Sequence, residues 1–205
     1  MLTVGLTGSI ACGKSAVSKI LTRKGAEVID LDQVAREVVQ PGTAAWSKIV
    51  SFFGQDVLAG DGSLNRRKLG EIIFADVNQR KKLNEITHGP IINKVLERKK
   101  IFSSSPKNRG KMLVIMAPLL IEAGMNNMVE LIIVVTCHEE IQKKRLMERE
   151  NINGLEAERR MGSQMPPEEK NKYADFIIDN SGSLEETAEQ VDRIWVNLIS
   201  NGKLQ

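Results

Sequence analysis

The segment that most constrains the fold of this chain is a short loop near its start, Gly8-Ser-Ile-Ala-Cys-Gly-Lys-Ser15. It fits the pattern G-x-x-x-x-G-K-[ST] in full. Residues 4–7 before it have the character of a buried strand, and residues 15–24 after it carry apolar side chains at helical spacing. Glycines let such a loop curl so that its N–H groups point at phosphate oxygens, next to the positive end of the following helix. The loop predicts a nucleoside triphosphate site; a chance match in a glycine-containing turn is the alternative.

The rest of the chain alternates short apolar runs with amphipathic helical stretches. Further strands are expected at residues 27–30, 112–117, 131–136 and 176–178. The continuous apolar runs among them are typical of parallel strands that are buried on both faces. This alternation predicts a three-layer α/β/α fold, with helices on both faces of a parallel sheet. Pro90 is expected to interrupt the helical, basic region 64–100, and Ser183-Leu-Glu-Glu186 is a capping box that begins a helix.

Composition excludes several classes of protein. The 205 residues include 29 Lys plus Arg and 26 Asp plus Glu, a net charge of +3 that predicts no nucleic-acid partner and no binding to an anionic membrane. We find neither a secretory signal nor an apolar run near the roughly 20 residues that span a bilayer. The two cysteines, Cys12 and Cys137, have no metal-type spacing, so we expect reduced thiols in a cytoplasmic protein.

Ligands of parallel α/β sheets bind at the carboxyl ends of the strands, where this sequence places several charged side chains. In the loop, Lys14 would contact the β- and γ-phosphates, and the Ser15 hydroxyl would ligate Mg²⁺. Asp30 and Asp32 come at the end of the second strand and share one side of it if the strand continues. A carboxylate there can accept the proton of an attacking hydroxyl. Alternatively, Asp32 caps the next helix, and Asp30 is a turn residue or lies near the magnesium ion.

A strongly charged helical stretch follows the fourth strand. Arg145 and Arg149 are four residues apart and share one helical face, and Arg159 and Arg160 lie further on. Such a run is usually a solvated surface. After a strand of a nucleotide-binding sheet, it can instead be a mobile lid whose arginines neutralise charge on the transferred phosphate.

Taken together, these residues resemble the dephospho-coenzyme A kinase family, from about residue 2 to residue 196. The loop is shared by many families, so the resemblance depends on the order and spacing of other short motifs: Val28–Asp32, Asp61–Arg66, Leu83–His88, Pro118–Glu122, Gln142–Arg149, Arg160–Gln164 and Ala174–Asn180 with Gly182. It implies a P-loop kinase that uses ATP and Mg²⁺ to phosphorylate the ribose 3′-hydroxyl of dephospho-CoA, the last step of coenzyme A biosynthesis. The implied core comprises residues 1–36 and 107–205, with a lid at about 139–172 and a helical acceptor-binding insertion at 37–106.

The resemblance also assigns roles to individual residues. Asp32 matches the general base and contacts the acceptor, while Lys14 and Arg145 act on the transferred phosphate. Arg66 and His88 match positions on the acceptor side, although His88 can equally be a structural histidine. Ser15 is the implied metal ligand. The implied ATP-binding residues are Gly8, Ser9, Ile10, Ala11, Cys12, Gly13, Lys14, Ser15, Ala16, Arg145, Arg149, Asn180 and Gly182. Asn180 to Gly182 match a segment near the adenine, or form a simple turn before the capped helix.

The sequence departs from the family pattern at three places. His88-Gly89-Pro90 replaces the usual His-Pro, Met116 stands where the strand before Pro118 often carries an acid, and Cys12 and Ala16 replace the commoner Ser and Thr of the loop.

Two other functions compete with the one that the resemblance implies. One is a small-molecule kinase for another acceptor, such as a nucleoside monophosphate or shikimate; the basic insertion favours an acceptor that carries phosphates. The other is a nucleotide-dependent switch without a transfer reaction. We expect a monomer rather than an obligate oligomer.

Overall fold

The computed structural model describes residues 1–204 and divides into two compact units. The first unit is formed by Met1–Asp30 with Phe102–Gln205, and the second by Leu31–Ile101. Among the described residues, no helix is long and apolar enough to cross a membrane.

The regular elements have the following bounds in chain order: β1 Leu2–Thr7, α1 Lys14–Arg23, β2 Glu27–Asp30, α2 Leu31–Glu37, α3 Ala44–Phe53, α4 Arg66–Ala75, α5 Val77–Ser104, β3 Met112–Met116, β4 Leu131–Thr136, α6 Glu139–Glu150, α7 Gly154–Gly162, α8 Pro167–Asn171, β5 Phe176–Asp179 and α9 Leu184–Ser200.

The first unit is built on a five-stranded sheet with the strand order β2-β3-β1-β4-β5, and every neighbouring pair is parallel. β1 lies in the middle, with Val4 opposite Val114 of β3 and Leu131 of β4. All residues of β1 and β3 are buried, as expected for a sheet that is covered on both faces. The loop after β1 therefore leaves the sheet at its centre, on the edge where ligands bind in this class of fold.

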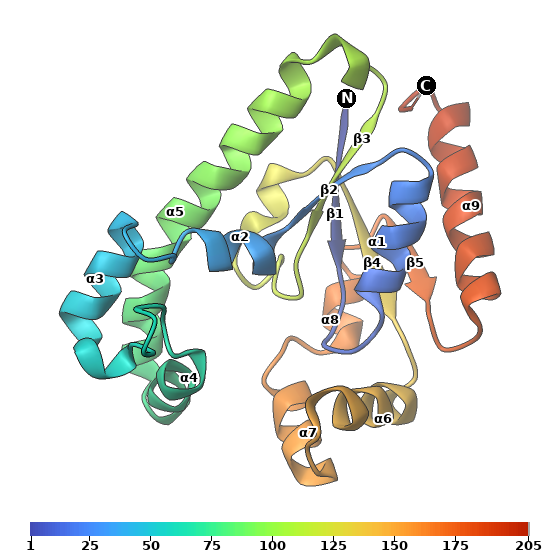
Figure 1. Cartoon of the computed structure of the whole chain (residues 1–205). Coiled ribbons are helices and arrows are strands. Elements are labelled where there is room, and N and C mark those ends of the chain that lie inside the picture. The colour runs from blue at the N-terminus through green and yellow to red at the C-terminus, as the bar shows by residue number, and fades with distance from the viewer. Residues whose placement is uncertain (205) are drawn as a thin grey trace. The chain divides into compact units, whose positions relative to one another are not determined.

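Helices α1 and α9 pack side by side on one face of this sheet (Figure 1). Val17, Ile20 and Leu21 of α1 and Val191, Ile194 and Leu198 of α9 share one apolar core with the strands. α9 begins at the predicted capping box, in which Ser183 and Glu186 satisfy each other's backbone N–H groups. The opposite face of β1 is so close to the segment after β3 that a Cβ on Gly5 would contact Leu120.

The second unit is helical and has an apolar core of its own. Ala45 and Ile49 of α3 pack with Leu69 of α4 and with Val57. The side chain of Thr43 caps α3, and the Trp46 indole donates a hydrogen bond to the Gly62 carbonyl at 3.1 Å. Arg98 of α5 and Glu37 of α2 form an ion pair with an N–O distance of 2.5 Å. This unit can therefore hold its helices in place through its own contacts.

The parallel α/β fold that the sequence predicts is confirmed, but two local predictions are wrong. Pro90 does not interrupt the basic helical region, because α5 continues through it. A proline clashes with the Cβ of the residue before it, and here that residue is Gly89, which has none. The second strand ends at Asp30 and α2 begins at Leu31, so Asp30 and Asp32 do not share one side of a strand.

Candidate active site

The predicted phosphate loop has a backbone that depends on its glycines. Gly8 has φ = 145° and Gly13 has φ = 95°, values that side chains disfavour. A Cβ on Gly8 would overlap the Val135 carbonyl, and one on Gly13 would overlap the Asn180 side-chain amide. The loop therefore packs directly against the end of β4 and the residue after β5. This close fit makes a chance match to the motif a poor explanation of the sequence.

Lys14 and Ser15 are the first residues of α1, so their side chains lie at the positive end of that helix. The Lys14 ammonium donates hydrogen bonds to the carbonyls of Gly8 at 2.7 Å and Ser9 at 3.0 Å. These two hydrogen bonds thus hold the positive charge of Lys14 next to the first residues of the loop. Ser15 is exposed, and residues 1–204 contain no cluster of three or more His, Cys, Asp or Glu side chains that could hold a metal ion. Mg²⁺ usually keeps several waters and takes few protein ligands beside substrate phosphates, so a single hydroxyl fits this ion.

Two lid glutamines hold both backbone polar groups of Ile10. The Ile10 N–H donates to Oε1 of Gln164 at 2.8 Å, and Nε2 of Gln142 donates to the Ile10 carbonyl at 2.8 Å. Gln142 lies on α6 and Gln164 follows α7, so the predicted lid contacts the loop through these amides. Sequence reasoning missed this role, although both residues stand in motifs of the family resemblance. Glutamines in a charged run do not indicate which backbone they will contact.

Asn180 and Arg145, two predicted site residues, do come together beside the loop. The Asn180 side chain is buried; its Nδ2 donates to the Cys12 carbonyl at 2.9 Å and its Oδ1 accepts from Thr187 at 2.8 Å. Arg145 donates to the backbone carbonyl of Asn180 at 2.9 Å. Asn180 therefore supports the loop with its side chain and positions a lid arginine with its backbone.

The other lid arginines pair with glutamates of their own segment. Arg149 contacts Glu150, and Arg159 and Arg160 both contact Glu156. Arg149 is exposed, as in the solvated-surface interpretation of this run.

Gly182 lies in a turn where a Cβ would overlap the Glu186 carboxylate of the capping box. Packing against the capping box is thus enough to explain why residue 182 is a glycine. Its proposed position near the adenine of ATP stays a prediction.

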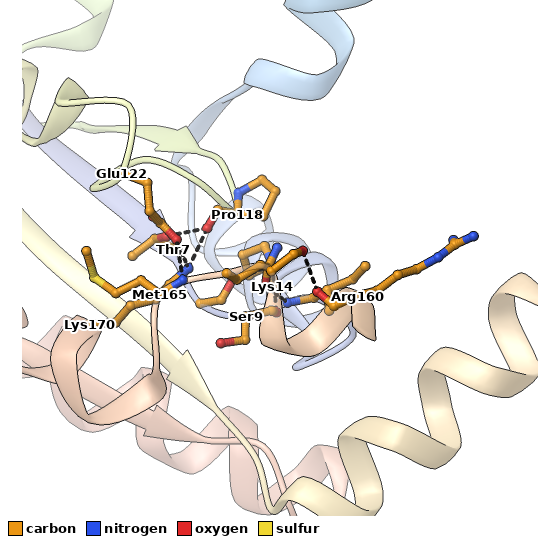
Figure 2. Close-up of polar contacts among 12 residues, drawn as sticks. Thr7, Ser9, Lys14, Pro118, Glu122, Arg160, Met165 and Lys170 are labelled. Carbon is orange, nitrogen blue, oxygen red and sulfur yellow. Dashed lines mark hydrogen bonds and ion pairs between the residues drawn. The ribbon is translucent and has the colours of Figure 1, made fainter. Parts of the chain in front are cut away.

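An ion pair between a buried lysine and a partly exposed glutamate joins the lid to the segment after β3 (Figure 2). The ammonium of Lys170, on α8, lies 2.9 Å from Oε1 of Glu122 and donates to the Pro118 carbonyl at 2.7 Å. The same Glu122 oxygen accepts the backbone N–H of Met165 at 3.2 Å, next to Gln164. The pair therefore holds the lid's return segment beside the glutamine that contacts the loop. Sequence reasoning missed Lys170, which looked like one solvated lysine among many.

Asp32, Arg66 and His88 lie in the second unit. Asp32 is in the first turn of α2, which starts one residue earlier, so it is not the cap that the alternative interpretation required. Arg66 begins α4, after the Asn65 cap. Partial burial and the nearby charge of Arg36 lower the pKa of Arg66. His88 is exposed on α5.

A parallel sheet with a phosphate loop after its central strand, followed by a lid that contacts this loop, defines a P-loop kinase. The family model described as dephospho-CoA kinase matches residues 2–186 of the chain. The dephospho-CoA kinase of Listeria innocua is 48% identical over 200 residues, which cover 97% of this chain and 98% of that protein. The chain belongs to the dephospho-CoA kinase family.

Solved structures agree with this assignment. The dephospho-CoA kinase from Campylobacter jejuni has a TM-score of 0.72 and 31% identity, with 98% of each chain covered. A shikimate kinase from Acinetobacter baumannii has a TM-score of 0.54 at 13% identity, with 98% of this chain and 94% of that chain covered, which shows a shared fold only. The fold alone therefore does not select the acceptor.

Proposed function

We propose that this chain transfers the γ-phosphoryl group of ATP to the ribose 3′-hydroxyl of dephospho-CoA and releases coenzyme A and ADP. The observation that carries the proposal is the family match across nearly the whole chain, on a structure whose phosphate loop is fully formed. We expect this reaction to take place in the cytoplasm and the protein to act as a monomer.

The transfer needs a positioned hydroxyl and neutralised phosphate charge. The 3′-oxygen attacks the γ-phosphorus, the bond to the bridging oxygen of ADP breaks, and Asp32 accepts the hydroxyl proton. Backbone N–H groups of residues 8–16, with Lys14 and Arg145, stabilise the charge on the phosphates. Ser15, together with the phosphates, would hold Mg²⁺, which would neutralise further phosphate charge. Arg149 and the segment from Asn180 to Gly182 complete the ATP site in this proposal.

The acceptor would bind in the second unit, through Asp32, Arg66 and His88. That unit also has an open groove of about 540 Å³ between α3 and α5, lined by Ser47, Lys48, Ser51, Phe52, Lys82, Glu85 and Ile86. A volume in the range of about 300–1,000 Å³ is usual for small-molecule sites. Lys48 and Phe52 suit a long ligand with both phosphates and apolar parts, as dephospho-CoA is, while Lys82 pairs with Glu85 of the same groove at 3.1 Å.

The direct test is ADP formation from ATP with and without dephospho-CoA, with the product identified by mass spectrometry. We expect release of ADP to depend on dephospho-CoA, and the product to carry its new phosphate on the 3′-oxygen. AMP and shikimate serve as control acceptors. Turnover of either control without turnover of dephospho-CoA would favour another kinase, and ATP loss that no acceptor accelerates would favour a nucleotide switch.

Asp32→Asn tests the proposed base. The amide keeps the size of the side chain but accepts no proton, so we expect kcat to fall by about 10²–10⁴-fold. The Kd for ATP, measured by calorimetry, should stay unchanged because Asp32 does not bind the nucleotide in this scheme. Asp30→Asn, two residues earlier, is the matched control and should keep most of the activity. Full turnover by Asp32→Asn would remove the assignment.

A further inference from the structure

The two cysteines of the chain, 125 positions apart, contact each other beside the phosphate loop. The Cys137 thiol donates a hydrogen bond to Sγ of Cys12 at a sulfur–sulfur distance of 3.3 Å. Cys12 belongs to the loop, and Cys137 directly follows β4. The kinase reaction proposed above needs neither thiol, so their contact calls for a separate explanation.

Their surroundings make the two thiols unequal. The hydrogen bond from Cys137, together with the charges of Lys14 and Lys170, lowers the pKa of Cys12 although burial opposes the shift. The same hydrogen bond and burial raise the pKa of Cys137, while Arg145 and Asp179 act on it with opposite signs. Cys12 is therefore the better nucleophile and Cys137 the natural resolving thiol.

We propose that Cys12 and Cys137 are a redox modification site, which a hydroperoxide such as hydrogen peroxide converts into a reversible disulfide that blocks ATP binding. The Cys12 thiolate attacks one peroxide oxygen, the O–O bond breaks, and hydroxide leaves as water after it takes up a proton. The sulfur of Cys137 then attacks the resulting sulfenic acid, the S–O bond breaks, and a second water leaves. Two thiols and one peroxide thus give one disulfide and two waters.

The geometry allows the bond once the two sulfurs move toward each other. A disulfide is about 2.05 Å long, so the two sulfurs must approach each other by more than about 1 Å. A small cavity of about 10 Å³ is lined by both cysteines, together with Ser9, Val134, Val135, Thr136, Pro167 and Lys170, and it gives the sulfurs room to move. Cys12, the attacking thiol, is buried and Cys137 is half-buried, so a peroxide molecule must enter past Cys137 to reach Cys12.

The backbone around Cys12 has little room to adapt to this movement. Its N–H donates to the Ser9 carbonyl at 3.3 Å, and its carbonyl accepts from Asn180 at 2.9 Å. Gly13, the next residue, is already packed against the Asn180 side chain. A shift of Cys12 toward Cys137 therefore redirects the N–H groups of Gly13 and Lys14, which would bind the phosphates of ATP.

The experiment compares the full-length protein and its Cys137→Ser variant, each reduced or treated with hydrogen peroxide. Non-reducing peptide mapping by mass spectrometry should find the Cys12 peptide joined to the Cys137 peptide in the wild type, with the loss of two hydrogen atoms. Because a misplacement of about 1 Å can reduce activity by about 100-fold, we expect a loss of that size, with a matching rise in the Kd for ATP. Dithiothreitol should restore both.

Cys137→Ser should keep its basal activity and form no linked peptide, and oxidation of its Cys12 should stop short of a disulfide with residue 137. The proposal is overturned if no linked peptide forms in the wild type, or if the linked protein binds ATP as the reduced one does. Inactivation that dithiothreitol does not reverse would also overturn it, because sulfinic acid is the irreversible product. Mapping detects the disulfide without any assay of activity, so a failure of this proposal is distinguishable from a failure of the proposed function.

Discussion

The most unusual residue of the structure is Lys170, whose side chain is 1% exposed. A lysine this deeply buried needs a partner, and Glu122 and the Pro118 carbonyl provide one. An ion pair of this kind seldom adds much net stability, because the ammonium must leave water completely and the carboxylate in part. Its effect is instead to fix where the chain goes. Here it holds α8 and Met165, and with them the glutamine that binds the phosphate loop.

Glu122→Met should destabilise the protein by about 3–5 kcal/mol, because it leaves the fully buried Lys170 ammonium without a carboxylate. Lys170→Met should cost less, about 1–3 kcal/mol, because the Glu122 carboxylate that it leaves behind is partly exposed to water. The double variant should lose less than the sum of the two single losses, since no unpaired charge is left. Urea unfolding measures all three free energies. Losses that simply add would contradict the coupling of the two side chains.

At the scale of the element, α5 is unusual because it continues through a proline. Pro90 has no N–H to give to the carbonyl of Ile86, and a proline in a helix interior usually costs about 3 kcal/mol. Gly89 removes part of that cost, because no Cβ meets the proline ring. The two residues are thus coupled: the glycine makes the proline tolerable, and the helix continues past it.

Pro90→Ala should raise the free energy of unfolding by about 1–3 kcal/mol, because it restores a helical hydrogen bond. Gly89→Ala should stabilise by about 1 kcal/mol when combined with Pro90→Ala, since a Cβ at residue 89 meets no other atom. In the wild-type background, Gly89→Ala should give a smaller gain or a loss, because the new Cβ meets Pro90. Urea unfolding with a check of equal m-values distinguishes these cases. An equal gain from Gly89→Ala in both backgrounds would rule out the coupling.

At the scale of the whole molecule, the sequence was enough to predict what depends on local pattern. The strands, the glycine loop and the capping box all follow from periodicity and residue type, and the structure confirms them. What could not be predicted depends on contacts between distant segments. Examples are the pair of Lys170 and Glu122, the two glutamines on Ile10 and the contact between Cys12 and Cys137. The pattern of a single sequence does not show which residues, far away along the chain, a side chain will contact.

The two compact units lead to a prediction about the whole molecule. If the first unit binds ATP and the second binds the acceptor, each ligand should slow hydrogen exchange in its own unit, because binding suppresses local opening. ATP with Mg²⁺ should protect amides of residues 8–16 and of the lid helices α6 and α7. Dephospho-CoA should protect residues within 31–101, above all in α3 and α5, which border the groove.

Hydrogen exchange read by mass spectrometry makes this measurement at peptide resolution. Dephospho-CoA contains an adenine nucleotide of its own, so it should be titrated with a non-hydrolysable ATP analogue already bound, which keeps it out of the loop. Lys14→Met is the matched control. It removes the charge that is held across the loop, so it should abolish the protection by ATP and leave the protection by dephospho-CoA in place. If dephospho-CoA protected only amides of the first unit, the helical insertion would not be the acceptor site, and Arg66 and His88 would lose their proposed roles.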